Sequence, residues 1–224
     1  MLPPPALELG AIAPVSAVPP RAARGSVLRY SAAVLAPDRR RFLIACAALA
    51  ACRTKPELPS LGTLSEFALT DQDGRRLGSA ELRGRVWVAA FMFTRCPTIC
   101  PRITRRMREL QIEAAGRKLG ITLVSFSVDP ENDTPEVLRA YAQKYGVDPA
   151  SWRFLTGDLE VVRKTAVDGV KMALDGKADP SKPDYGILHG TYLVLIDRDL
   201  RLRGYYRTES PEDTARLLDD AARV

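Results

Sequence analysis

Residues 86–101 read VWVAAFMFTRCPTICP, and the fold follows from this stretch. Its first eight residues are all apolar or aromatic, which is typical of a strand buried on both faces of a sheet. After the two cysteines, apolar residues recur at intervals of four, three and four, which indicates one face of a helix. These residues are Ile103, Met107, Leu110 and Ala114. The sequence therefore predicts an α/β fold with the cysteines at a junction between a strand and a helix.

The remaining pattern alternates strands and helices. Residues 121–128 (ITLVSFSV) form a second buried run, and residues 191–196 and 202–206 flank a turn as an antiparallel pair. We also expect strands at 66–70 and 152–155, a loop at 168–188, and helices that begin at Thr134, near residue 158 and at a Ser210–Asp213 capping box. This alternation predicts a central mixed β-sheet flanked by helices. The place of the cysteine pair points to the thioredoxin-like class.

Net charge gives little support to nucleic-acid binding. The 224 residues carry a formal charge of +6, but the first 52 residues contribute +4 of it and the rest only +2. No nucleic-acid motif accompanies this mild excess. We therefore expect no nucleic-acid partner.

The N-terminal region resembles an export signal. Residues 1–38 are rich in Pro and Ala and predict a disordered or untranslated extension. Three arginines then precede residues 42–51, an apolar run too short to cross a bilayer, which needs about 20 residues. The run ends in Leu-Ala-Ala-Cys at residues 49–52, which resembles a bacterial lipobox. Ordinary cleavage after Ala50 is the alternative.

These features divide the chain into four parts. Residues 39–52 are predicted to be a lipoprotein-type signal peptide ending at Cys52, and residues 53–60 a tether. Residues 61–224 form the predicted thioredoxin-like domain, which carries the Cys96 and Cys100 pair. A lipid on Cys52 would hold this domain at the extracytoplasmic (periplasmic) face of the cell membrane.

Cys96 and Cys100 are separated by three residues, whereas thioredoxin-like oxidoreductases use two. Their place at a helix N-terminus favours the thiolate form. Spacing of four positions brings both sulfurs to one side of a helical turn. Such a pair can form a disulfide or chelate one soft ion such as Cu(I).

His189 is the only histidine in the chain and precedes the strand expected at 191–196. Thioredoxins carry a cis-proline in the corresponding loop, but here no proline lies between Pro183 and Pro211. Two thiolates and this imidazole suit three-coordinate Cu(I), or Cu(II) with a further oxygen ligand. Structural zinc usually takes four ligands, and the predicted domain has no fourth Cys or His.

Three motifs resemble the Sco/SenC family of copper chaperones. They are residues 93–101 (FTRCPTICP), residues 124–135 (VSFSVDPENDTP) and Leu188-His189 before a strand, and the likeness spans about residues 60–222. The resemblance implies a thioredoxin fold and copper bound by Cys96, Cys100 and His189. It also implies a role in building the dinuclear copper centre of cytochrome c oxidase, whose copper-bearing subunit would be the partner, alongside other periplasmic copper chaperones.

Two departures from the family pattern stand out. Gly190 follows the histidine where a serine is common, and Thr98-Ile99 replaces a more polar, often acidic, pair between the cysteines. Neither departure removes a predicted ligand.

Two enzymatic alternatives stay open. Cys96 and Cys100 are also the redox pair expected of an extracytoplasmic thiol-disulfide oxidoreductase that keeps a partner's copper-ligand cysteines reduced. A peroxiredoxin-like peroxidase is disfavoured because Thr94-Arg95-Cys96 is one residue short of a Thr-x-x-Cys motif.

Asp129 is either a partner of the site or a turn residue before Pro130. Arginines near the cysteines either dock an acidic partner or form a solvated helix face: Arg95, Arg102, Arg105, Arg106 and Arg108.

Overall fold

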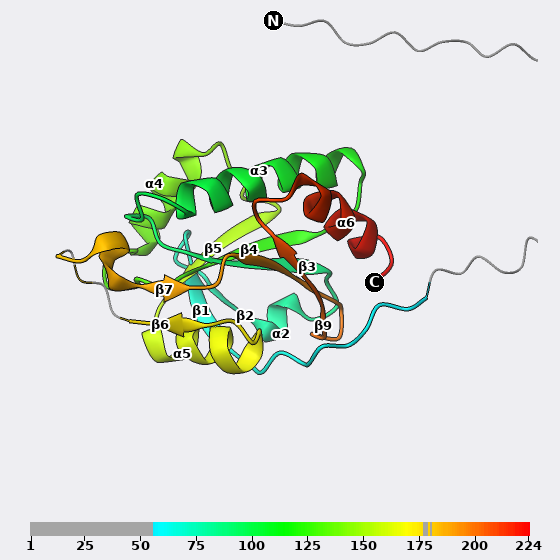
Figure 1. Ribbon diagram of the computed structural model, residues 1–224, viewed down its shortest axis with the longest axis horizontal. Helices are drawn as coiled ribbons and strands as arrows, with labels where there is room; N and C mark the ends of the chain where they lie inside the picture. Colours follow the sequence, from blue (N-terminus) through cyan, green and yellow to red (C-terminus); the bar gives the residue numbers. More distant parts are fainter. Residues whose placement is uncertain (1–55, 177–178, 180) are drawn as a thin grey trace, which may run out of the picture. The chain divides into compact units, whose positions relative to one another are not determined.

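The computed structural model describes residues 56–176, 179 and 181–224, and its core is a mixed seven-stranded sheet (Figure 1). The strand order is β2-β1-β5-β4-β3-β8-β9, in which β3–β4 and β4–β5 pair in parallel and the other pairs are antiparallel. The strands are β1 (Ala68–Asp71), β2 (Arg76–Gly78), β3 (Trp87–Met92), β4 (Thr122–Ser127), β5 (Trp152–Thr156), β8 (Tyr192–Ile196) and β9 (Leu202–Arg207). The predicted central mixed sheet is confirmed.

Helices cover both faces of this sheet. Figure 1 shows α3, α4 and α6 above the sheet and α2 and α5 below it. Their bounds are α2 (Ser79–Leu82), α3 (Cys100–Gly116), α4 (Pro135–Lys144), α5 (Leu159–Lys164) and α6 (Pro211–Ala221). A π-helical turn, Thr165–Gly169, extends α5, and a 3-10 turn, Pro183–Gly186, precedes β7. This layering is that of the thioredoxin-like class.

Strand β3 occupies the centre of the fold because every one of its side chains is apolar. All six residues are buried, as predicted for a strand covered on both faces. Phe91 stacks on Phe126 of β4 with ring centroids 5.0 Å apart, which joins the two parallel strands through the core. The fixed end of β3 therefore sets where the cysteine segment begins.

Helix α3 follows that segment and packs its predicted apolar face on the sheet. Ile103, Met107 and Leu110 are each at most 2% exposed. Pro101 lies in the first turn, where its missing N–H leaves no hydrogen bond unmade. The N-terminus of α3 is thereby held at the end of β3.

The expected loop at 168–188 is wrong in part. It contains a two-residue strand, β6 (Leu174–Asp175), which pairs antiparallel with β7 (Leu188–His189). Strands of two residues are too short to show a period in the sequence. Strand β2, with three residues, and helix α2, with four, were not predicted either, because they are also too short to show a period.

The capping box at α6 forms only in half. Ser210 Oγ accepts the N–H of Asp213 at 3.1 Å, as expected. The Asp213 carboxylate does not return the bond to Ser210 but accepts the N–H of Arg207 at 3.0 Å. The Asp213 carboxylate therefore bonds to the end of strand β9 instead of to the N-cap residue.

The N-terminal predictions lie outside the described residues: the extension at 1–38, the signal peptide at 39–52 and the first part of the tether at 53–55. The described part of the tether contacts the domain, since Arg203 Nη1 donates to the Leu58 carbonyl at 2.6 Å. Within the described ranges, no helix has the length and apolar character needed to cross a bilayer.

Truncation of Met107 tests the packing of α3. Met107→Ala removes a side chain that is 0% exposed and leaves a cavity beneath the helix that carries Cys100. We expect the free energy of unfolding to fall by about 2–5 kcal/mol in denaturant titrations. Ile112→Ala on the same helix is the matched control, because Ile112 is 57% exposed and should change stability by no more than about 0.5 kcal/mol. Equal losses in the two variants would contradict the packing described.

Candidate metal centre

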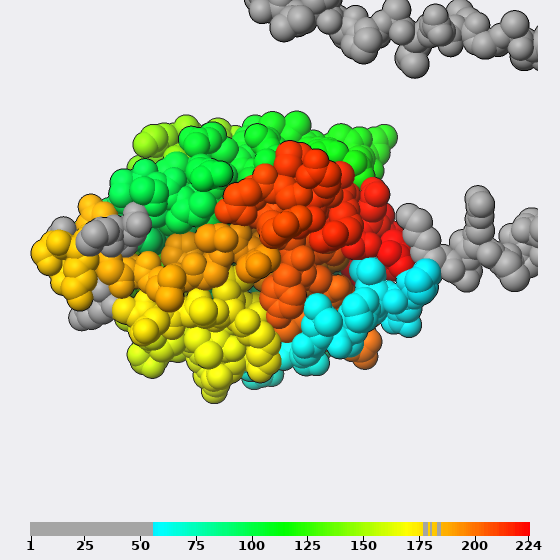
Figure 2. All heavy atoms as spheres, viewed as in Figure 1, coloured from blue at the N-terminus to red at the C-terminus, as the bar shows by residue number. Residues whose placement is uncertain are grey.

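Cys100 and His189 meet although 89 positions separate them. Cys100 begins α3, after residues 93–99 that follow β3, and His189 ends the short strand β7. The Cys100 Sγ and His189 Nε2 atoms are 3.5 Å apart, and both side chains are buried. Figure 2 shows the orange segment that contains β7 and β8 between green α3 and yellow α5. The fold thus brings together the sulfur of Cys100 and the imidazole of His189, as predicted.

Cys96 lies four residues before Cys100, in the non-helical segment that precedes α3, and its sulfur contacts the first residue of the helix. Its Sγ accepts the backbone N–H of Cys100 at 3.4 Å and lies 3.8 Å from Thr98 Oγ1. Burial alone would raise the pKa of the Cys96 thiol, but hydrogen bonds from Cys100 and Thr98 outweigh it and lower the pKa below the ordinary value. Cys96 therefore loses its proton more readily than an ordinary cysteine does.

Cys100 has the opposite tendency. It is fully buried, and this desolvation raises the pKa of its thiol far above the ordinary value. Neighbouring Cys96 and Asp133 raise it further, against a hydrogen bond with the Phe93 backbone that lowers it. Cys100 therefore keeps its proton, and its S–H can donate to Nε2 of His189.

The second ring nitrogen of His189 fixes the tautomer. Nδ1 lies 3.0 Å from the Gly190 carbonyl oxygen, and a carbonyl can only accept, so Nδ1 carries the proton. Burial lowers the pKa of His189, against the opposing effect of this bond, so the ring is neutral at pH 7. The Nε2 lone pair then faces Cys100. Metal-binding histidines commonly have this arrangement, with the other N–H donated to a carbonyl.

The three predicted ligands are close but do not form a ready three-point cluster. No group of three or more His, Cys, Asp or Glu side chains among the described residues is placed to hold a metal ion. Both Cys96 and Cys100 are free thiols. Cys100 and His189 are in contact, and Cys96 adjoins them through the Cys100 amide. That these three bind a metal stays a prediction.

Two carboxylates of the 124–135 motif support the cysteine segment. Asp129 pairs with Arg95 at 2.8 Å, so it is more than a turn residue. Asp133, which we did not single out from the sequence, is 0% exposed and accepts hydrogen bonds from Thr94 N–H at 3.1 Å and Ser127 Oγ at 2.6 Å. Its only sequence signal is its place in that motif. Both carboxylates fix the chain just before Cys96.

Gly190 lies tightly under Met172. A β-carbon on Gly190 would come within 2.2 Å of Met172 Cγ and 2.7 Å of its Sδ. The Met172 side chain therefore occupies the space that a side chain at position 190 would need.

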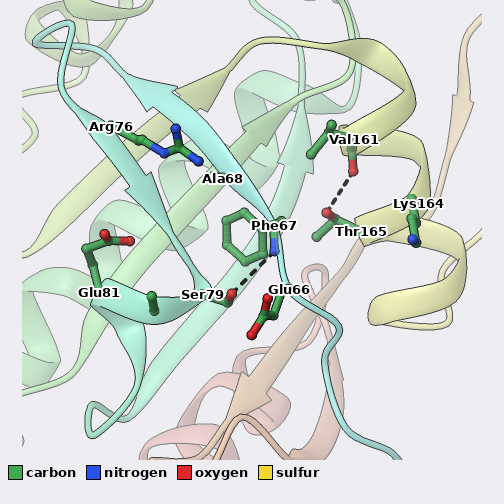
Figure 3. A pocket seen from close by; sticks show the side chains of 10 residues that line it. Glu66, Phe67, Ala68, Arg76, Ser79, Glu81, Val161, Lys164 and Thr165 are labelled. Atoms are coloured by element: carbon green, nitrogen blue, oxygen red, sulfur yellow. Dashed lines mark hydrogen bonds between the residues drawn. The ribbon is translucent and has the colours of Figure 1, made fainter.

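A separate hollow of about 510 Å³ lies beside β1, β2 and α5. Figure 3 shows its lining, which includes Glu66, Arg76, Ser79 and Lys164 but no cysteine or histidine. It lacks the soft donors that copper selects, so it is not a candidate for the metal centre.

Together these features define a thioredoxin-like protein whose cysteine pair at a helix N-terminus faces a buried histidine. The family model described as SCO1/SenC matches residues 57–223. The chain therefore belongs to the SCO1/SenC family, as its motifs predicted. A SCO1 protein homolog of Bacillus subtilis is 43% identical over 91 residues, which cover 41% of this chain and 47% of that relative.

Three solved structures share the fold. A SCO1/SenC family lipoprotein from Bacillus anthracis is 37% identical with a TM-score of 0.68, covering 75% of this chain and 98% of the other. BsSco, described with a disulfide switch and as a member of the Sco family of cytochrome c oxidase assembly proteins, is 30% identical with a TM-score of 0.66, covering 75% and 99%. Copper-bound ScoI of Bradyrhizobium japonicum is 27% identical with a TM-score of 0.55, covering 70% and 98%.

The unequal pKa values predict unequal reactivity of the two thiols. Because the pKa of Cys96 is lowered, its thiolate persists to lower pH than that of an ordinary cysteine. Iodoacetamide should alkylate Cys96 with a midpoint below the ordinary thiol pKa, while Cys100 stays unmodified across the same range. Peptide-resolved mass spectrometry over a pH series measures both.

Thr98→Val removes the hydroxyl beside Cys96 Sγ and should shift this midpoint to higher pH. Faster alkylation of Cys100 than of Cys96 at pH 7 would contradict the described asymmetry.

Proposed function

We propose that this protein is a copper metallochaperone that binds one copper ion through Cys96, Cys100 and His189. The observation that carries the proposal is the 3.5 Å contact between Cys100 Sγ and the Nε2 of His189, whose Nδ1 is already engaged by a carbonyl. Soft thiolate ligands favour Cu(I), and imidazole suits either copper oxidation state.

Copper binding requires that the cysteines be reduced and deprotonated. The lowered pKa of Cys96 eases the loss of its proton, whereas the buried Cys100 thiol has to be deprotonated as the metal binds. A small movement of the Cys96 segment completes the three-ligand set. The reduced dithiol is therefore the form competent to bind copper.

The proposed target is the copper-bearing subunit of cytochrome c oxidase, whose dinuclear centre the protein would load or mature by ligand exchange. Two family members support this: ScoI of Bradyrhizobium japonicum has copper bound, and BsSco is described within a family of cytochrome c oxidase assembly proteins. Other periplasmic copper chaperones are further candidate partners, as donors of the metal.

We also propose a lipid anchor on Cys52 that keeps the domain at the extracytoplasmic face of the cell membrane. The Leu-Ala-Ala-Cys sequence at 49–52 supports it, as does the lipoprotein relative from Bacillus anthracis.

Cys52→Ser should move the protein from the membrane fraction to the soluble extracytoplasmic fraction, because the thiol that accepts the lipid is lost. Cell fractionation followed by mass measurement of the N-terminal peptide checks this. Cys46→Ser is the matched control and should leave the protein in the membrane fraction. Retention of the Cys52→Ser protein in that fraction, with no lipid on the wild-type peptide, would rule out the anchor.

Copper titration of the reduced protein tests the proposed ligands. His189→Ala, Cys96→Ser and Cys100→Ser should each lower Cu(I) affinity by more than about 100-fold, since even the loss of an outer hydrogen-bond partner costs 10- to 100-fold. Competition with a chromophoric Cu(I) chelator gives the affinities. Leu188→Ala, an exposed neighbour of His189, is the control and should bind as the wild type does. Wild-type Cu(I) affinity in His189→Ala would show that the imidazole is not a copper ligand.

The second candidate function is a thiol-disulfide oxidoreductase that keeps a partner's copper-ligand cysteines reduced. It is favoured by the contrast between the reactive Cys96 and the protonated Cys100, which is typical of an attacking and a resolving thiol. In the same variants, His189→Ala separates the two functions. Loss of copper affinity with intact disulfide reduction would show that the activities use different parts of the site.

A further inference from the structure

Arg95, directly before Cys96, is fixed at its charged end. Its Nε and Nη2 atoms both donate to Asp129 Oδ2, at 3.1 and 2.8 Å. Asp129 is buried, and its other carboxylate oxygen accepts from Asn132 Nδ2 at 2.8 Å. A buried carboxylate that is held on both oxygens gives the guanidinium one defined position.

The opposite side of the guanidinium faces the segment that carries His189. Arg95 Cζ lies 4.6 Å from the ring centroid of Tyr185, which belongs to the 3-10 turn before β7. The same ring meets Phe93 edge-on at 5.9 Å, and Phe93 meets the His189 ring edge-on at 6.1 Å. A continuous set of contacts therefore runs from Asp129 to the imidazole.

Tyr185 has a backbone conformation that needs such support. Its φ of +57° is in the left-handed region, which a bulky aromatic residue rarely adopts. Strained residues of this kind persist where the surroundings determine them. The contacts with Arg95 and Phe93 are part of those surroundings, together with backbone hydrogen bonds of Tyr185 with Lys182 and Asp179.

The backbone alone holds β7 weakly. It pairs with β6 over only two residue pairs, and Gly190 N–H adds one bond to the Ala173 carbonyl at 3.0 Å. Arg163 reaches the carbonyls of Leu174 and Gly176, which secures β6 rather than β7. The side-chain contacts of Tyr185 are thus a principal link between the segment that carries His189 and the segment that carries the cysteines.

We propose that Arg95 is a positioning residue for His189: through the ring of Tyr185 it holds the 185–189 segment against the end of β3, so that the imidazole stays at Cys100. The proposal rests on the proposed copper site for its effect on affinity. Without the clamp, by which we mean the Arg95–Tyr185 contact, the segment spends less time in the binding-competent arrangement, and apparent affinity falls in proportion.

The test uses the full chain, reduced and metal-free, with variants that separate the ring from the hydroxyl of Tyr185. Tyr185→Leu removes the aromatic face and leaves the Arg95–Asp129 pair intact, whereas Tyr185→Phe keeps the face. Arg95→Gln removes the cation. Arg102→Gln, a change at an exposed arginine near the same cysteines, is the matched control.

We expect Tyr185→Leu and Arg95→Gln each to lower Cu(I) affinity about tenfold, in line with the strength of a partly buried cation–π contact. The double variant should lose less than the sum of the two single losses, because both changes break the Arg95–Tyr185 contact. Tyr185→Phe and Arg102→Gln should match the wild type.

A second readout needs no copper. His189 is the only histidine in the chain, so its ring resonances in metal-free protein are unambiguous in NMR spectra. In Tyr185→Leu and Arg95→Gln these signals should move toward those of a solvent-exposed imidazole, while Tyr185→Phe leaves them in place.

Wild-type affinity and unshifted histidine signals in Tyr185→Leu would overturn the proposal, as would equal losses in Tyr185→Phe and Tyr185→Leu. If Arg95→Gln unfolds because Asp129 loses its partner, Tyr185→Leu decides alone. Failure of the wild type to bind copper would refute the proposed function instead, and the metal-free histidine signals would still decide the clamp.

Discussion

The contact between Cys100 and His189 depends on two pieces of chain that have no local reason to meet. Cys100 is placed by β3, which is buried on both faces, and by residues 93–99, which the Asp133 and Asp129 carboxylates hold between β3 and α3. His189 is placed by the two-residue strand β7, which pairs only with the equally short strand β6. One half of the site is therefore rigid because it is part of the core, and the other half is held by a few specific contacts. Any process that loosens the second half opens the site without unfolding the protein.

Protons are distributed unevenly over the three side chains. The helix N-terminus supplies an amide to Cys96 and favours its thiolate, while the core withholds water from Cys100 and keeps its proton. The imidazole is neutral, and its outer nitrogen is engaged by Gly190. The three side chains therefore differ in how readily they lose a proton: the pKa of Cys96 is lowered, the imidazole is neutral, and Cys100 keeps its proton. In the proposed copper site, a proton that returns to Cys100 would favour release of the metal.

The strand β3, the helix α3 and the pair of β8 and β9 could be predicted from sequence because each shows a regular pattern over five or more residues. The same pattern located Cys96 and Cys100 at the helix start. The position of His189 was predicted from its place before β8, but its contact with Cys100 depends on the β6–β7 pairing, which has no periodic signal. For Asp129 the sequence left two alternatives open, and Asp133 was not singled out, since their partners Arg95 and Thr94 lie 34 and 39 positions away in the chain. The sequence thus predicted the candidate ligands but not the residues that hold them in position.

The packing of Met172 against Gly190 has an evolutionary consequence. Because the thioether occupies the volume of a β-carbon at position 190, any side chain there forces residue 172 to move or shrink. The two positions are therefore expected to depend on each other: a serine after the histidine requires Met172 to change its rotamer or to be replaced by a smaller residue. A chain with serine at 190 and methionine at 172 should be less stable than one with a smaller residue at 172, even though neither position is a predicted ligand.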